Sequence, residues 1–348
     1  MGIDLIAGNG IKEERLMESR TAGEIVNGVP GHLRHLGVLR VAGPDAFGFL
    51  QGQISSDTRR LQAGTPLLAA CSSAQGRVFA ILLLLPHSSG ILGILPRELV
   101  VPTAERLRKY VLRSKVRIED ASDEFVVAGH YDPQVLRAVG LRLAEADRPY
   151  TETDSVGIAG AGVAAPDSRP AASIRYWVVG PASRLAATGL AGHPDEAGRI
   201  EHDWRLADIV AGLPQIYAAT RDLFVAQMLN LDLLDGISFS KGCFTGQEII
   251  ARTQHLGRIK RRMFRLRLPN ASWRIGGDVR LADGRSGRLT ELVRQGEVFE
   301  ALAVLPIDAA SKDSDADPQS APVAAERVDA ARAAGIELPL PYALSAAP

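Results

Sequence analysis

Cysteine is scarce in this chain, which has two among 348 residues, Cys71 and Cys243. Two cysteines cannot form a disulfide scaffold, and they cannot supply the four thiolates of a zinc or iron–sulfur site. The seven histidines include no HxxxH pair, and none has a cysteine neighbour at metal-ligand spacing. We therefore expect no protein-bound metal, unless ligands distant in sequence converge in the fold.

Net charge and long apolar runs are missing as well. Forty lysines and arginines balance forty aspartates and glutamates, so any attraction to nucleic acid or membrane must come from local clusters. The most apolar stretch, 78–95, is cut by a turn at 86–90, which favours two buried strands over a membrane span. Residues 1–16 carry charges and glycines where a signal peptide needs an apolar run, which predicts a cytoplasmic protein.

Apolar periodicity predicts an α+β protein made of two similar passes and a β-rich end. The first pass has expected strands at 36–41, 66–71, 77–85, 90–95 and 115–118, and helices after Gly43 and at 102–113. The second has expected strands at 125–128 and 174–179, and helices at 133–139, 181–191 and 201–211. From Arg262, short strand-like runs between Gly and Asp turns are typical of a small β-barrel or sandwich.

These patterns divide the chain into four parts. Residues 1–35 form an irregular N-terminal segment, 36–123 a first α+β unit, and 124–260 a second α+β unit. Residues 261–348 form a C-terminal β-barrel with a mobile loop near 307–323.

One stretch carries recognisable chemistry, Lys241-Gly-Cys-Phe-Thr-Gly-Gln-Glu248. We predict a strand at 237–240, a glycine-bearing turn, and a helix over 247–254. A cysteine near a helix N-terminus and two residues from a lysine has two reasons for a lowered pKa and a more nucleophilic thiolate. The alternative is a turn in which Cys243 is a small buried residue and Lys241 faces water. Local chemistry alone leaves both open, whereas Cys71, at the end of an apolar run, is expected in the core.

The whole octet is similar to the signature of the YgfZ-type folate-binding proteins, which belong to the aminomethyltransferase-like family and are related to the glycine cleavage T-protein. Further matches follow in family order and cover most of residues 36–260. They are Gly43–Ala46, Phe49–Asp57, Gln75–Arg77, Leu112–Val116, Val225–Asp232, Leu234–Phe239 and Ala251–Thr253.

This resemblance implies two ferredoxin-like α+β units and a C-terminal β-barrel around a central pocket that binds tetrahydrofolate or a one-carbon derivative. It makes Cys243 and Lys241 the candidate catalytic residues. The candidate cofactor-binding residues are Gln227, Asn230, Gln247, Glu248, Arg252 and Arg77. Each has a plainer alternative: the glutamine and glutamate of the octet could only cap the helix, and Arg77 could be a surface charge.

Two departures from the family pattern bear on the activity. Aminomethyltransferases carry an acidic pair where this chain has Phe79 and Ala80, and Val210 stands where an acidic residue is common. The resemblance therefore favours a tetrahydrofolate-binding protein that supports iron–sulfur cluster assembly or repair, and through it tRNA modification. A folate-dependent aminomethyltransferase is the alternative, and whether the protein is an enzyme stays open.

A basic stretch suggests a third function, binding of tRNA or of an acidic partner. Its members lie within sixteen residues that contain no acid: Arg252, Arg258, Lys260, Arg261, Arg262, Arg265 and Arg267. Such a stripe could contact phosphates, although solvated charges along a helix end and an edge strand explain it equally well.

Overall fold

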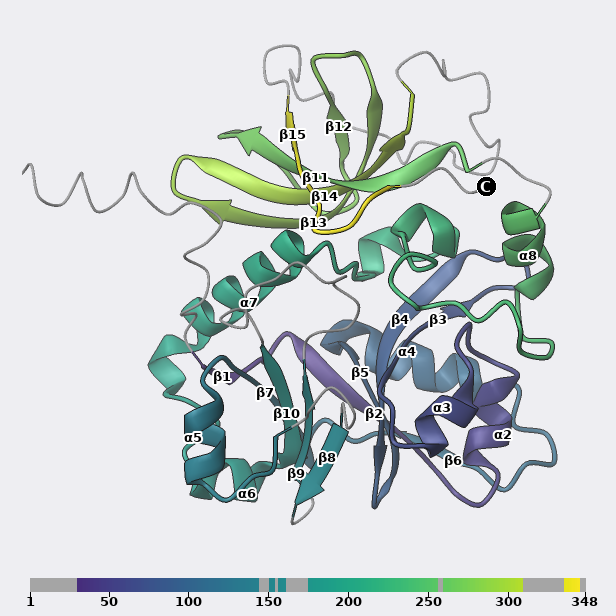
Figure 1. Cartoon of the computed structure of the whole chain (residues 1–348), viewed down its shortest axis with the longest axis vertical. Coiled ribbons are helices and arrows are strands. Elements are labelled where there is room, and N and C mark those ends of the chain that lie inside the picture. The colour runs from purple at the N-terminus through teal and green to yellow at the C-terminus, as the bar shows by residue number, and fades with distance from the viewer. Residues whose placement is uncertain are drawn as a thin grey trace, which may run out of the picture.

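The computed structural model describes residues 30–143, 150–153, 156–160, 175–255, 259–308 and 335–344. The chain forms three five-stranded antiparallel sheets with helices beside them, which is the mixed α+β architecture expected from the sequence. In Figure 1 the third sheet lies at the top, and the first and second sheets lie below it on opposite sides.

The first sheet has the order β3-β4-β5-β2-β6. Its strands are β2 (Leu36–Ala42), β3 (Leu67–Ser72), β4 (Val78–His87), β5 (Gly90–Pro96) and β6 (Arg117–Asp120). The short helices α2 (Ala46–Gln51) and α3 (Thr58–Gln62) and the longer α4 (Arg97–Arg108) accompany it. The helix α4 begins five residues before the expected start at Pro102, which lies inside it instead. Pro102 is tolerated there because buried neighbours on both sides, including Leu99 and Leu107, fix the helix against the sheet.

The second sheet has the order β1-β7-β10-β9-β8. Its strands are β1 (Gly31–His32), β7 (Phe125–His130), β8 (Tyr150–Thr153), β9 (Val156–Gly160) and β10 (Tyr176–Pro181). Two short helices, α5 (Pro133–Ala138) and α6 (Ala182–Ala187), shelter an apolar cluster of their own on this sheet. Because β1 pairs with β7, the chain enters the second sheet before it builds the first.

The third sheet has the order β12-β13-β14-β11-β15 and therefore has two end strands. Its strands are β11 (Arg261–Pro269), β12 (Asp278–Arg280), β13 (Ser286–Gln295), β14 (Val298–Pro306) and β15 (Ile336–Leu338). The expected closed barrel is not found among the described residues. The end strands have three residues each and pair with β13 and β11, not with each other. An isolated bridge between Leu281 and Gly335 links the residues beside them. Most of the loop expected at 307–323 falls outside the described residues.

One helix connects the sheets. The helix α7 (Ala197–Ala211) packs on β1 of the second sheet and on β13 and β14 of the third, and Figure 1 shows it lying directly under the third sheet. The chain after α7 runs through the 3-10 helices η4 (Ala218–Thr220) and η5 (Ala226–Leu229) to α8 (Gln247–His255). This connecting chain packs along the first sheet and contributes Phe224, Leu229 and Leu234 to the main apolar core.

Among the described residues, no helix is both long enough and apolar enough to span a bilayer.

Candidate functional site

Four segments that are far apart in sequence meet beside the first sheet: 52–58, 72–77, 221–231 and 241–250. Backbone contacts join them: Thr245 N donates to Gly52 O at 3.1 Å, and an isolated β-bridge links Arg77 to Val225. The turn of the octet touches the turn after β3, since a Cβ on Gly246 would lie 2.5 Å from Ser73 O. All four segments overlap stretches that carry the family resemblance, so the fold gathers these matches into one place.

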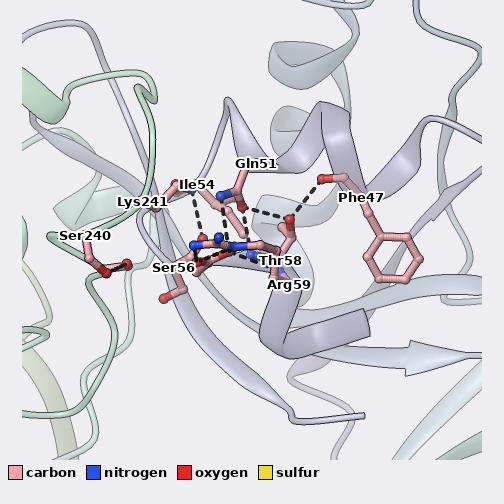
Figure 2. A network of polar contacts seen from close by, with 10 residues as sticks. Phe47, Gln51, Ile54, Ser56, Thr58, Arg59, Ser240 and Lys241 are labelled. Carbon is pink, nitrogen blue, oxygen red and sulfur yellow. Dashed lines mark hydrogen bonds and ion pairs between the residues drawn. The ribbon is translucent and has the colours of Figure 1, made fainter. Parts of the chain in front are cut away.

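Lys241 fastens the octet to the first of these segments. Its side chain is buried, and its Nζ donates to Ile54 O and to Ser56 O, both at 2.9 Å (Figure 2). The ammonium also lies 4.9 Å from the centre of the Phe244 ring. Burial lowers the pKa of Lys241 to about 8, although the negative charge of Asp57 acts in the opposite direction. The ammonium therefore points toward the 52–58 loop and crosslinks two segments.

Side-chain hydrogen bonds hold the 52–58 loop in a shape that directs two of its carbonyl groups toward Lys241. Asp57 caps α3 by accepting from Arg59 N, and the guanidinium of Arg59 holds the pKa of that carboxyl well below its usual range. Gln51 Oε1 accepts from Thr58 N at 2.8 Å, which closes the network drawn in Figure 2. Ser55, fully buried, donates to Gly236 O and accepts from Ala70 N.

Sequence reasoning gave this loop no role in the site. The available signal was Ser55-Ser-Asp57 directly before a helix, a capping pattern that predicts an ordered turn.

Cys243 is exposed and has no disulfide partner, whereas Cys71 is buried in β3 as expected. The sequence left open whether Cys243 is a core residue, and its exposure excludes that alternative. Local packing explains the exposure, because Lys241 and Phe244 on either side of the Gly242–Cys243 pair turn into the protein. The predicted strand over 237–240 is wrong, since this stretch is irregular chain that hydrogen-bonds to the 52–58 loop.

The helix α8 begins at Gln247, as predicted, and holds three of the candidate ligand residues. Gln247 Oε1 accepts from Phe244 N at 3.2 Å and so stabilises the turn before the helix. Glu248 and Arg252 are exposed and one turn apart. Thr245, two residues before the helix, directs its hydroxyl to Gly52 O at 3.4 Å. The helix is thus held by its own turn and by the end of α2.

Gln227 and Asn230 are both fully buried, but their polar atoms differ in what they contact. Asn230 adopts a left-handed backbone conformation, donates to Met263 O at 2.8 Å and accepts from Met263 N at 3.3 Å. Its amide therefore joins η5 to β11. Gln227 donates to Ile250 O at 2.7 Å, while its Oε1 has no hydrogen-bond partner in the described structure. A buried amide oxygen without a partner is an acceptor that a ligand N–H could satisfy.

Arg77 is half-buried just before β4, where its guanidinium donates to Leu223 O at 2.8 Å. Two residues further, Phe79 is buried under two other guanidinium groups, those of Arg106 and Arg221. No carboxylate side chain stands at position 79 or 80, as the sequence shows, and the surroundings are cationic.

The second departure from the family pattern, Val210 in place of an acidic residue, lies on α7. Val210 is half-buried, and two residues earlier Asp208 is buried in an ion pair with Arg175 at 2.8 Å. Burial raises the pKa of Asp208 to about 6, against the opposing charge of Arg175. Residues two apart point to different sides of a helix, so Asp208 does not replace an acid at position 210.

The basic stretch does not form a free cationic stripe in the described structure. Arg262 is buried and makes a two-point ion pair with Asp232, and Arg265 and Arg267 share Glu300. These acids come from another segment and from the neighbouring strand β14, so the lack of acids in the local sequence was misleading. Arg258 lies outside the described residues.

Comparison with solved structures places this fold in the aminomethyltransferase-like class. The chain superposes on the glycine cleavage system aminomethyltransferase T from Bartonella henselae with a TM-score of 0.60, covering 81% of this chain and 80% of that one. The two are 16% identical, so the likeness concerns the fold alone.

Curated relatives define the family more narrowly. The chain is 33% identical over 281 residues to the tRNA-modifying protein YgfZ of Edwardsiella ictaluri (strain 93-146), covering 71% of this chain and 78% of the relative. It is 31% identical over 321 residues to the protein of the same name from Yersinia pestis (strain Pestoides F), covering 88% and 90%. No family model matches the chain. The chain belongs to the YgfZ family.

Proposed function

We propose that this chain is a cytoplasmic, tetrahydrofolate-binding protein that supports assembly or repair of iron–sulfur enzymes, and through them tRNA modification. The observation that carries the proposal is the family membership, since relatives named tRNA-modifying protein YgfZ match 88% of the chain. The structure adds support for the proposal, because the family-matched segments come together around Lys241 and Cys243.

Within this proposal Cys243 is the reactive group. Its exposed thiol could meet a partner enzyme or a one-carbon unit without any rearrangement of the core. Lys241 acts as a positioning residue, because its two hydrogen bonds to the 52–58 loop fix the turn on which the cysteine stands. Glu248, the last residue of the octet, and Arg252, one turn further along α8, are exposed and offer one charge of each sign to a ligand or partner.

The buried residues near the octet offer a pterin ring one unused hydrogen-bond acceptor. The unpartnered Oε1 of Gln227 is a buried acceptor, and a pterin offers several N–H donors. Gln227 would therefore hold the ring, with Gln247 and Arg77 as further candidates and Asn230 fixing the wall behind it. When bound, the folate supplies or accepts the one-carbon unit.

Calorimetric titration with tetrahydrofolate tests the proposal. Wild type should bind, and Gln227→Met, which removes the free acceptor but keeps the volume, should bind about tenfold more weakly. Gln134→Met, at an exposed position on α5, is the matched control and should bind like wild type. Absence of binding by folded wild type would refute the folate-binding role.

An aminomethyltransferase activity is the second candidate, because the fold is similar to that of aminomethyltransferase T. The cationic surroundings of Phe79 oppose it, since two guanidinium groups disfavour a positively charged amine nearby. Incubation with tetrahydrofolate and an aminomethyl donor should give no methylene-tetrahydrofolate. Clear product formation would reverse the order of the two functions.

A further inference from the structure

The ring of Phe79 lies beneath two guanidinium groups from separate parts of the chain. The Cζ of Arg106, on α4, lies 4.8 Å from the ring centre, and that of Arg221, just after η4, lies 5.1 Å from it. Phe79 itself is 7% exposed, so the ring forms a buried floor. Arg106 already donates to Ser72 O and to the Cys71 side chain. The guanidinium of Arg221 has no hydrogen bond within the described residues, so its N–H edge can form two parallel hydrogen bonds to an oxyanion.

The positive charge at this site is incompletely balanced. Asp222 is the acid whose charge acts on both arginines, yet no ion pair within 4.0 Å joins it to either one in the described structure. Burial raises the pKa of Asp222, although the charges of Arg106 and Arg221 act in the opposite direction. One carboxyl group therefore faces two guanidinium groups. Two cations that share one ring repel each other, and a bound anion would relieve that repulsion.

Hydrogen-bonding capacity is also left unused beside Arg106. The guanidinium donates to Ser72 O at 3.1 Å, while the hydroxyl of the same serine, 1% exposed, has no partner. Thr103 lies one turn before Arg106 on the same face of α4, and its buried hydroxyl has no partner either. Buried hydroxyl groups without partners are uncommon and call for a ligand or water.

One non-glycine residue with a left-handed backbone conformation lies next to this site. Asp222 has a φ of 62°, although it is not a glycine, and its N–H donates to Val78 O at 2.9 Å. This bond ties the chain that carries Arg221 to the start of β4, directly beside Phe79. Strained backbone held in place by its surroundings is frequent where a protein positions a group for binding.

We propose that Arg106 and Arg221, stacked on Phe79, form a binding site for a small oxyanion, a carboxylate or phosphate group of a ligand. Arg221 is exposed and forms the entrance, so the ligand reaches the ring from the surface. This site does not depend on the proposed folate role. The structure specifies only the oxyanion group of its ligand, a carboxylate or a phosphate.

Titration at low ionic strength with inorganic phosphate and, separately, with glutarate tests the site and identifies its preferred oxyanion. Saturable binding of either probe is expected. Arg221→Gln should weaken it at least about tenfold. Arg221→Lys keeps the charge but loses the planar fork, so its affinity for the probe should lie between those of wild type and Arg221→Gln. Arg221 is exposed, so both variants should fold, and thermal unfolding confirms this.

Arg199→Gln, at a position 65% exposed on α7, is the matched control and should leave binding unchanged. Binding of phosphate alone assigns a phosphate-bearing ligand, and binding of glutarate alone assigns a carboxylate-bearing one. Failure of both probes to saturate, or equal binding by wild type and Arg221→Gln, overturns the proposal. Tetrahydrofolate titration of the same samples reports separately on the proposed function.

Discussion

Among single residues, the two cysteines differ most in their surroundings. Cys71 is 2% exposed and burial raises its pKa to about 11, whereas Cys243 is exposed on the octet. We expect one thiol per native chain to react rapidly with an aromatic disulfide reagent, and both to react after unfolding, because access and thiolate fraction set the rate. Cys243→Ser should remove the rapid reaction and change the free energy of unfolding by less than about 0.5 kcal/mol.

Cys71→Ser is the matched control, and it should keep the rapid reaction while it destabilises the core. Two rapid thiols in native protein, or none, would contradict the placement of Cys243.

Lys241 should make stability depend on pH. Its pKa is about 8 in the folded protein against 10.5 for an ordinary lysine, so between these values the unfolded chain binds more protons. The free energy of unfolding therefore gains from this group as pH rises from about 8 to 10.5, by up to about 1 kcal/mol per pH unit. Below pH 8 the group is charged in both states and its contribution is constant.

Lys241→Met removes this contribution. Urea unfolding of wild type and variant from pH 7 to 10 should give a difference in free energy that grows with pH above 8. A constant difference over the whole range would mean that the pKa of Lys241 is not lowered. The variant should also loosen the turn that bears Cys243, which slower or faster thiol reaction would show.

At the scale of elements, two glycines of the octet have unequal roles. Gly246 has a φ of +84°, and a Cβ there would lie 2.5 Å from Ser73 O, whereas Gly242 has open space around it. Gly246→Ala should lower the free energy of unfolding by about 2 kcal/mol or more, because it adds backbone strain and a clash. Gly242→Ala should change it by less than about 0.5 kcal/mol, as measured by urea unfolding. Equal effects of the two substitutions would show that the octet does not pack against the turn after β3.

Periodicity predicted most elements because the apolar residues of each element pack into one of three buried clusters. The strands β2 to β5 and the helix α8 fall within a few residues of their expected bounds. The prediction of a strand over 237–240 was wrong because the apolar alternation there is that of a strand, whereas its hydrogen-bond partners are loop atoms. The octet was recognisable from its residues, but the direction of Lys241 was not. A spacing of two residues from Cys243 does not determine where a long side chain turns.

For the whole molecule, the buried pair of Arg262 and Asp232 joins the third sheet to the chain around η5. Its members are 2% and 6% exposed, with the shorter contact at 2.6 Å. Asp232→Ala should lower the free energy of unfolding by about 3–5 kcal/mol, because it leaves a buried guanidinium without a partner. Asp278→Ala, which breaks a more exposed pair with Arg288, is the control and should cost about 1 kcal/mol or less. Similar losses in thermal unfolding for the two variants would mean that this pair does not hold the third sheet to the chain around η5.

The assembly of the three sheets was the part least accessible from sequence. The acids that neutralise the basic stretch lie on other segments, Asp232 after η5 and Glu300 on β14. Similarly, no local pattern indicates that Arg106 and Arg221 meet on one aromatic ring. Such contacts depend on long-range packing, which local periodicity does not encode.

The two acceptors of Lys241 are main-chain carbonyls, of Ile54 and of Ser56. Every amino acid carries such a carbonyl, so the side chains at these two positions can drift during evolution without loss of the contact, provided that the loop keeps its shape. The lysine has no such freedom, because no shorter side chain would reach both oxygens. In distant relatives, therefore, the lysine should be a better guide to this site than the loop that receives it.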